Sequence, residues 1–206
     1  MKDDIQRVLG IFHKPRESIA EIRTLEVGKQ GVAFALLTAG IFTSIYSFFF
    51  GMALVNPMLP IDSDLLPFAI ILIAVVLFIM SIMFIAFTWI ICSAASHLLL
   101  RAQGCTGDFD TFYTGNGYAL IVFVVQPVIG MLLLMILGPS DILFSYDLIS
   151  SIVVRIWFGI IVALSMKENY NSTWKQITIA IIIALVITAL YPIIPQYLSF
   201  SFLPPG

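Results

Sequence analysis

Charged residues are scarce in this chain of 206 residues. Asp, Glu, Lys and Arg together make up 11% of it, against about 25% in an ordinary soluble domain. Apolar residues make up 60%, so the few charged groups cannot cover a solvated globule of this size. This composition excludes a soluble enzyme, and it excludes a disordered protein, which needs low hydrophobicity and high charge. A mean hydropathy of +1.05 indicates that most of the chain lies in lipid.

Cysteine and net positive charge are also lacking. The two cysteines, Cys92 and Cys105, make no disulfide framework. A net charge of −2 argues against a nucleic-acid partner, which binds to a basic face. The first 30 residues carry charges throughout, and the apolar run behind them is too long for the core of a cleaved signal peptide. We therefore expect one membrane domain and no nucleic-acid partner.

Long apolar runs are abundant, and five of them are long enough to cross the ~30 Å hydrocarbon core of a bilayer. Segments that cross lipid must be helical, because isolated strands would leave backbone groups unpaired. The sequence thus predicts an all-α integral membrane protein with five transmembrane helices. They form a domain over 31–196, with spans at about 32–55, 67–99, 117–138, 142–166 and 176–194.

Two features of these runs predict local structure. No Pro, Gly or charge interrupts the chain from Phe68 to Leu100, so we expect one helix of about 50 Å that tilts or projects from the bilayer. Between the third and fourth runs, Gly138 and Pro139 are followed by Asp141 as the expected N-cap. Such a short link predicts that these two helices are antiparallel neighbours.

Nine of the ten basic residues fall on one side of the predicted spans. Six precede the first span, and three lie in the loops after the second and fourth spans: Lys2, Arg7, Lys14, Arg16, Arg23, Lys29, Arg101, Lys167 and Lys175. The segments on the other side carry none. The positive-inside rule therefore predicts a cytoplasmic N-terminus and a short extracytoplasmic tail over 197–206.

Residues 1–30 are predicted to form a cytoplasmic amphipathic helical segment. Ile5, Leu9 and Phe12 have the spacing of an apolar helical stripe, Pro15 restarts the chain, and Ser18 has capping-box spacing to a following Glu. We expect this segment to lie on the inner leaflet, with anionic lipid headgroups as candidate partners. The alternative is that it packs on the cytoplasmic loops of the protein.

Residues with catalytic or metal-binding chemistry are few. Cys92 and His97 are about 140° apart around a helix, which favours packing or capping roles over a zinc site. Asp147 follows a tyrosine, as in intramembrane aspartyl proteases, but Asp108 and Asp110 are predicted at the opposite face of the membrane and could not share a water with it. We predict no catalytic residue, no metal and no cofactor.

One charge falls inside a predicted span. Arg155 lies near the middle of the fourth span, where an unpaired guanidinium costs several kcal/mol. Gln126 is expected at a similar depth in the third span, beside a carbonyl freed by Pro127, and Asp147 lies two turns from Arg155. The predicted Arg155–Gln126–Asp147 cluster is either a ligand site for an anion or a headgroup, or a polar clamp between helices.

Several stretches resemble the Yip1 family of five-span membrane proteins, in its short prokaryotic form. An F-x-x-P motif ends at Pro15, a Gly-Tyr-Ala motif begins with Gly117 and Tyr118, and Pro127 follows in the same span. The close coupling of the third and fourth spans, and the later Trp157 and Gly159, also fit.

The resemblance implies a non-enzymatic role in membrane organisation or protein interaction, in the cell membrane of a prokaryote. The long N-terminal region of eukaryotic members is absent, so no Rab-type GTPase partner is expected. Further copies of the chain or other membrane proteins remain candidate partners. The rival hypothesis is a small transporter or a lipid- or anion-binding protein with its site around Arg155 and Gln126.

Overall fold

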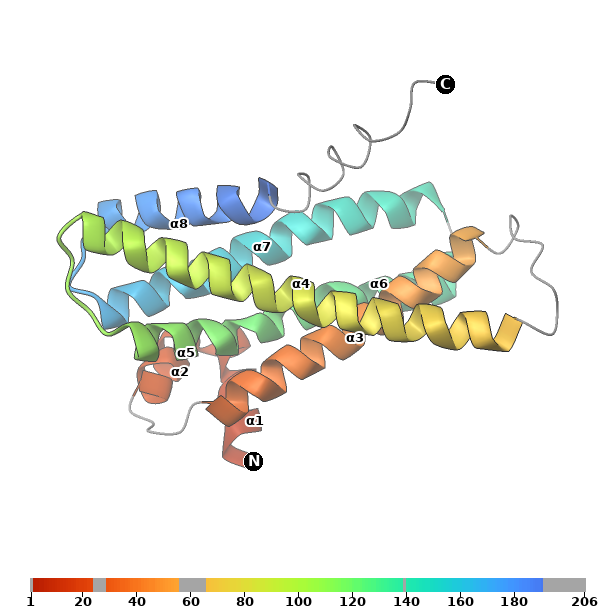
Figure 1. Cartoon of the computed structure of the whole chain (residues 1–206), viewed down its shortest axis with the longest axis horizontal. Coiled ribbons are helices and arrows are strands. Elements are labelled where there is room, and N and C mark those ends of the chain that lie inside the picture. The colour runs from red at the N-terminus through yellow and green to blue at the C-terminus, as the bar shows by residue number, and fades with distance from the viewer. Residues whose placement is uncertain (1, 24–28, 56–65, 139, 191–206) are drawn as a thin grey trace, which may run out of the picture.

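The computed structural model describes residues 2–23, 29–55, 66–138 and 140–190, and these form a bundle of helices (Figure 1). The elements are α1 (Lys2–His13), α2 (Pro15–Arg23), α3 (Lys29–Val55), α4 (Leu66–Ala102), α5 (Phe109–Ala119), the 3-10 helix η1 (Leu120–Val124), α6 (Val125–Leu137), α7 (Asp141–Asn169) and α8 (Trp174–Leu190). Within the described residues, the only β pairing is an isolated bridge between Gly107 and Tyr170. The all-α prediction is confirmed.

Four helical stretches are long and apolar enough to cross a membrane: Gly31–Gly51, Phe68–Ala102, Phe109–Leu137 and Ser145–Asn169. A fifth apolar helix, Trp174–Ile187, is shorter. The predicted fifth span, 176–194, is described only as far as Leu190, and the predicted tail over 197–206 lies outside the described residues. The chain is therefore a membrane protein with several membrane-spanning helices.

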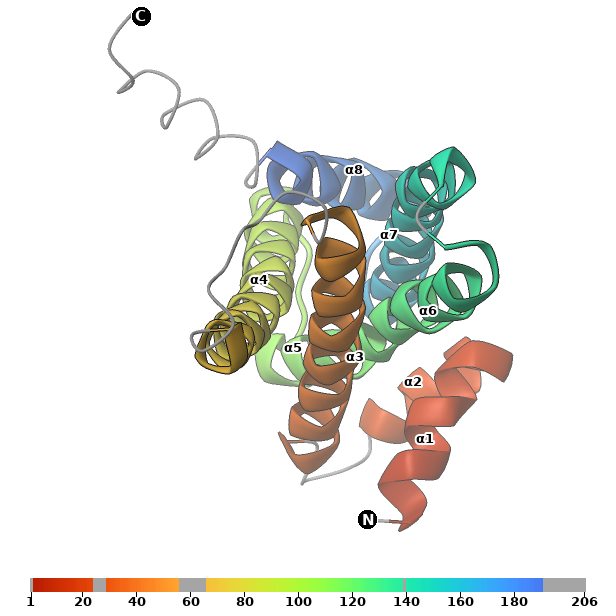
Figure 2. The same ribbon diagram turned by 90° about the vertical axis from the view of Figure 1, so that its right-hand side faces the viewer.

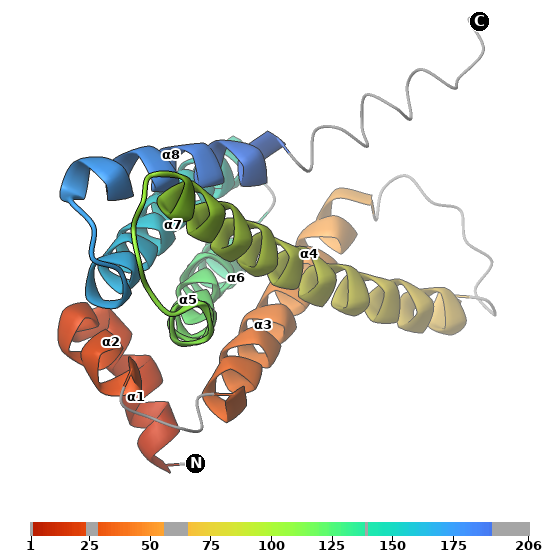
Figure 3. The ribbon, with the colours of Figure 1, turned by 60° about the vertical axis from the view of Figure 1, so that its left-hand side comes forward.

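The longest apolar run forms one unbroken helix, as predicted. Helix α4 has 37 residues, which gives a length of about 55 Å. It packs against α3 and α8 and is inclined to α3 (Figure 3). Gly40 of α3 allows this contact, because a Cβ there would lie 2.5 Å from the side chain of Ile82 on α4.

The third span begins earlier than the sequence predicts. Helix α5 starts at Phe109, whereas the predicted span starts at Gly117. Asp108 caps this helix: its carboxylate accepts from the Thr111 backbone N–H at 2.9 Å and from the Thr111 hydroxyl. The hydrogen bond from the Thr111 hydroxyl, and then the one from the Thr111 backbone N–H, lower the pKa of Asp108 below its usual range. The capping carboxylate therefore stays ionised. Helices α5, η1 and α6 then run on without a break to Leu137.

The link between α6 and α7 ends and restarts a helix, but with a different cap from the one predicted. Gly138 ends α6 with a φ of 64°, a conformation that glycine adopts at no steric cost. Ser140 is the N-cap of α7, with its hydroxyl 3.4 Å from the Leu143 backbone nitrogen. The predicted Asp141 cap is wrong, because Asp141 is already the first residue of the helix. The two helices pack against each other, as expected for so short a link.

The N-terminal segment forms a helical hairpin of α1 and α2, which we call the N-terminal hairpin. The predicted capping box at Ser18 is wrong: α2 begins at Pro15, so Ser18 lies inside the helix. It is buried where α1 passes closest, and a Cβ added at Gly10 would collide with its hydroxyl. Viewed along the bundle, the hairpin lies beside α3 and α6, away from α4 and α8 (Figure 2).

The N-terminal hairpin is docked onto the transmembrane helices. Ile11, Ile19 and Ile22 are almost completely buried in the same core as residues of α5 and α7. Arg16 adds an ion pair to Glu168 near the end of α7, at 3.1 Å. Leu9 remains 54% exposed. The hairpin thus makes protein contacts through one face and leaves apolar surface on another.

Candidate functional site

Two of the predicted site residues meet inside the bundle. The Gln126 side-chain amide of α6 donates to the Asp147 carboxylate of α7 at 2.9 Å. The Tyr46 hydroxyl of α3 donates to the same carboxylate oxygen at 3.2 Å. The Tyr146 hydroxyl donates to the Gln126 backbone carbonyl at 2.9 Å. We call these four residues the Asp147 cluster, and it joins three helices through one carboxylate.

The helices reach this geometry because one glycine lets them approach. Tyr46 is only 6% exposed, and its ring lies against Gly130 of α6. A Cβ at Gly130 would lie 2.6 Å from the nearest ring carbon, so a larger residue would push Tyr46 away from Asp147. Burial among apolar helices strengthens each hydrogen bond, and it also makes an unpaired carboxylate costly. The arrangement has the properties of a polar clamp.

Arg155 lies outside this cluster. Its side chain is exposed, and among the described residues no hydrogen bond or ion pair joins it to Gln126 or Asp147. Two turns separate it from Asp147, a rise of about 12 Å, and the two side chains point about 80° apart around the helix. Arg155 is instead one turn from Gly159, which faces Leu185 of α8.

The residues of the predicted family motifs have packing roles. Pro15 is the first residue of α2, a position where its missing N–H costs nothing. Gly117 and Tyr118 lie where α5 crosses α3: a Cβ at Gly117 would lie 2.5 Å from the Val32 side chain, and one at Gly31 would collide with the Tyr118 ring. Pro127 is buried in α6 next to Gln126.

A second polar group, near the ends of α4, α5 and α7, was not predicted. The Trp89 indole donates to the Tyr113 carbonyl at 3.0 Å, and the two rings stack. His97 and the Tyr170 hydroxyl are 2.5 Å apart. Burial raises the pKa of Tyr170 to about 12, so this hydroxyl keeps its proton and can donate it to the imidazole. The sequence signal that could have predicted this group is the spacing of aromatic residues after Asp108, in a stretch that was expected to be a loop.

Neither group has the geometry of a catalytic or metal centre. In the part of the chain that the structure describes, no three His, Cys, Asp or Glu residues lie close enough to hold a metal ion. Cys92 and Cys105 are buried as free thiols. The Asp147 carboxylate receives two donors and faces no nucleophile among the described contacts. What this arrangement can do chemically is hold helices together and hold one carboxylate in place.

The comparisons with known proteins agree with the motifs and the helical architecture. The family model for the Yip1 domain matches residues 9–194, which is nearly the whole chain and includes the N-terminal hairpin from Leu9 onward. No curated protein and no solved structure matches the chain. The extent of the domain match confirms the resemblance seen in the sequence, and the chain belongs to the Yip1 family of membrane proteins.

Proposed function

We propose that this protein is a non-enzymatic organiser of a prokaryotic cell membrane, with five spans and a cytoplasmic N-terminus. The observation that carries the proposal is the N-terminal hairpin, a pair of helices docked beside the bundle with apolar surface left uncovered. Leu9 is exposed and Phe12 is half-buried, whereas Lys14 and Arg16 extend into solvent with most of their side chains exposed. Apolar and basic groups arranged in this way are typical of helices at a membrane surface.

The orientation is supported by the contact between the hairpin and α7. Arg16 pairs with Glu168, and Glu168 lies beside Lys167 in the stretch that leads to Lys175. The basic N-terminal segment and this basic loop therefore lie at the same end of the bundle. The positive-inside rule assigns that end to the cytoplasm. Anionic headgroups of the inner leaflet are the partners that this surface favours.

A second candidate function, a lipid- or anion-binding protein or a small transporter, is favoured by one observation. Arg155 is exposed halfway along α7, away from the Asp147 cluster, where a lipid phosphate or another anion could reach it. An arginine in a membrane-spanning helix is costly unless it is paired or hydrated. Replacing Arg155 with leucine and measuring the lipid that the protein retains tests this candidate.

A charge placed on the apolar surface of the hairpin tests the proposed function. Proteoliposomes of the full chain should become smaller as the protein-to-lipid ratio rises, because the hairpin inserts into one leaflet. Leu9→Glu should abolish this dependence. Burying a leucine side chain in the leaflet stabilises membrane insertion by roughly 1.5–3 kcal/mol, whereas a carboxylate at the same position opposes insertion. The measurement is the vesicle diameter by cryo-electron microscopy.

The matched control adds the same charge at an exposed polar position of the same helix. Gln6→Glu should leave the vesicle diameters at the wild-type values, because Gln6 is already exposed. Equal diameters for the wild type, Leu9→Glu and protein-free vesicles would contradict the proposed role of the hairpin.

A further inference from the structure

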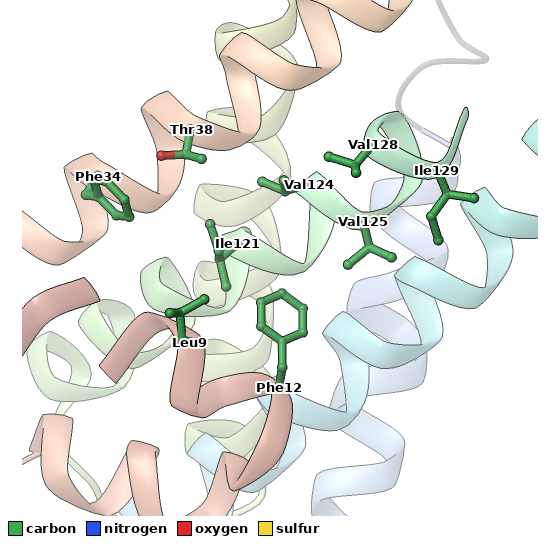
Figure 4. A pocket seen from close by; sticks show the side chains of 9 residues that line it. All are labelled: Leu9, Phe12, Phe34, Thr38, Ile121, Val124, Val125, Val128 and Ile129. Carbon is green, nitrogen blue, oxygen red and sulfur yellow. The ribbon is translucent and has the colours of Figure 1, made fainter. Parts of the chain in front are cut away.

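Two apolar grooves lie where α1 meets the bundle. The first, which we call groove 1, runs between α1, α3 and the η1–α6 segment and has a volume of about 370 Å³ (Figure 4). Groove 2 lies on the other side of η1 and α6, between α1 and α7, and has a volume of about 400 Å³. Both volumes lie in the range of small-molecule sites.

The grooves are neighbours that share two side chains. Phe12 of α1 and Val125 of α6 line both of them. In Figure 4, Phe12 points from α1 toward Ile121 and Val125. One aromatic ring from the N-terminal hairpin thus lies at the boundary between the two apolar grooves.

The lining of both grooves favours a hydrocarbon occupant. Thr38 is the one residue with a polar side-chain atom in groove 1, and groove 2 is lined by apolar side chains and Trp157. An ordered water needs two to four polar partners, and each groove has one lining residue with a polar side-chain atom. The walls belong to Gly31–Gly51, Phe109–Leu137 and Ser145–Asn169, which are long and apolar enough to cross the membrane, so lipid chains are the surrounding solvent.

We propose that the two grooves hold the two acyl chains of one diacyl phospholipid, with Phe12 between the chains. The hairpin then does more than rest on the leaflet: it seats one lipid against the bundle. This inference rests on the proposed position of the hairpin at the membrane. Its test measures bound lipid in detergent rather than vesicle shape, so either proposal can fail while the other stands.

Native mass spectrometry of the full chain, purified in detergent and given dioleoyl phosphatidylglycerol or dioleoyl phosphatidylcholine, tests the stoichiometry. We expect one diacyl lipid per chain at low lipid excess, and up to two copies of a single-chain lysophospholipid, because each groove holds one chain. Retention of either diacyl lipid shows the site, and the ratio between the two lipids reports the headgroup preference.

Filling the shared wall should remove the lipid. Val125→Trp should lower retention by about tenfold or more, because the larger side chain occupies space that both acyl chains need. Val186→Trp is the matched control, since Val186 is exposed on α8 and lines neither groove. Phe12→Ala is a second variant, outside the membrane-spanning helices, and it should also lower lipid retention. Its control is Phe68→Ala, on the exposed surface of α4, which should retain the lipid as the wild type does.

The outcomes separate the groove site from its rivals. Val153 and Trp157 line groove 2 on the face of α7 opposite to Arg155, so Arg155→Leu should retain the lipid as the wild type does. Loss of the lipid in Arg155→Leu, but not in Val125→Trp, would overturn the groove site in favour of an arginine-centred one. Wild-type chains that bind no diacyl lipid, or that form dimers in its place, would also overturn it.

Discussion

Replacing Gly117 with valine should prevent the protein from folding. Gly117 lies where α5 crosses α3, and a Cβ at this position would be 2.5–2.6 Å from both γ-carbons of Val32. The contact is reciprocal, because Gly31 of α3 faces Tyr118 of α5 with no room for a Cβ. Val32 and Tyr118 are buried, so neither can move aside without displacing its neighbours. We expect a cost on the order of 3 kcal/mol or more, at the upper end of the overpacking range.

The control for this prediction is another helical glycine with free space around it. Gly51→Val, on α3, meets no atom within 4 Å and should be tolerated. Fluorescence-detected size-exclusion chromatography of both variants gives the yield of monodisperse protein. A Gly117→Val yield equal to that of Gly51→Val would show that the α3–α5 crossing is not as close as described.

Replacing Gln126 with leucine should have the second-largest effect. The Asp147 carboxylate would keep only the Tyr46 hydroxyl as a donor, inside an apolar bundle. Leaving a buried polar group without its hydrogen-bond partner costs about 1–3 kcal/mol, and more when that group is charged. Because Asp147 is partly exposed, we expect roughly 2–3 kcal/mol. Thermal unfolding in detergent, followed by tryptophan fluorescence, measures the loss.

A double substitution distinguishes a stranded carboxylate from a general packing defect. Gln126→Leu with Asp147→Leu removes both polar groups and should recover most of the stability. Gln6→Leu, at an exposed position on α1, is the matched control and should behave as the wild type. If the double variant is no more stable than Gln126→Leu alone, the amide does not act through Asp147.

The membrane architecture could be predicted from the sequence because lipid imposes simple rules. Apolar length alone identified the four stretches of the described chain that are long enough to cross a membrane, including the unbroken α4. The start of α5 was missed because the stretch after Asp108 contains polar residues and glycines, which are typical of a loop. It is helical because Asp108 caps it and because Tyr113 packs on Trp89 of a helix that is distant in sequence. Such contacts are not visible in local patterns.

The candidate site could be predicted only in part. Counting residues along the helices predicted Gln126 at the depth of Arg155, but its side-chain amide meets Asp147, two turns away on α7. Which partner the amide meets depends on how the two helices are shifted along their axes and rotated about them, and neither can be read from a local sequence pattern. Tyr46 was missed because a single phenol in an apolar run gives no sign of the helix that it faces.

Orientation in the membrane is the central claim, and labelling of single cysteines in intact cells tests it most directly. With Cys92 and Cys105 replaced, a membrane-impermeant maleimide would be applied to Thr106→Cys, Asn171→Cys and Gly206→Cys variants. Thr106 and Asn171 lie in two loops that meet at one end of the bundle, where the Asn171 backbone N–H donates to the Thr106 carbonyl at 3.0 Å. Five spans with a cytoplasmic N-terminus predict that only the cysteine at position 206 is labelled before the cells are permeabilised. Labelling at 106 and 171 with protection at 206, or protection at all three positions, would contradict the account.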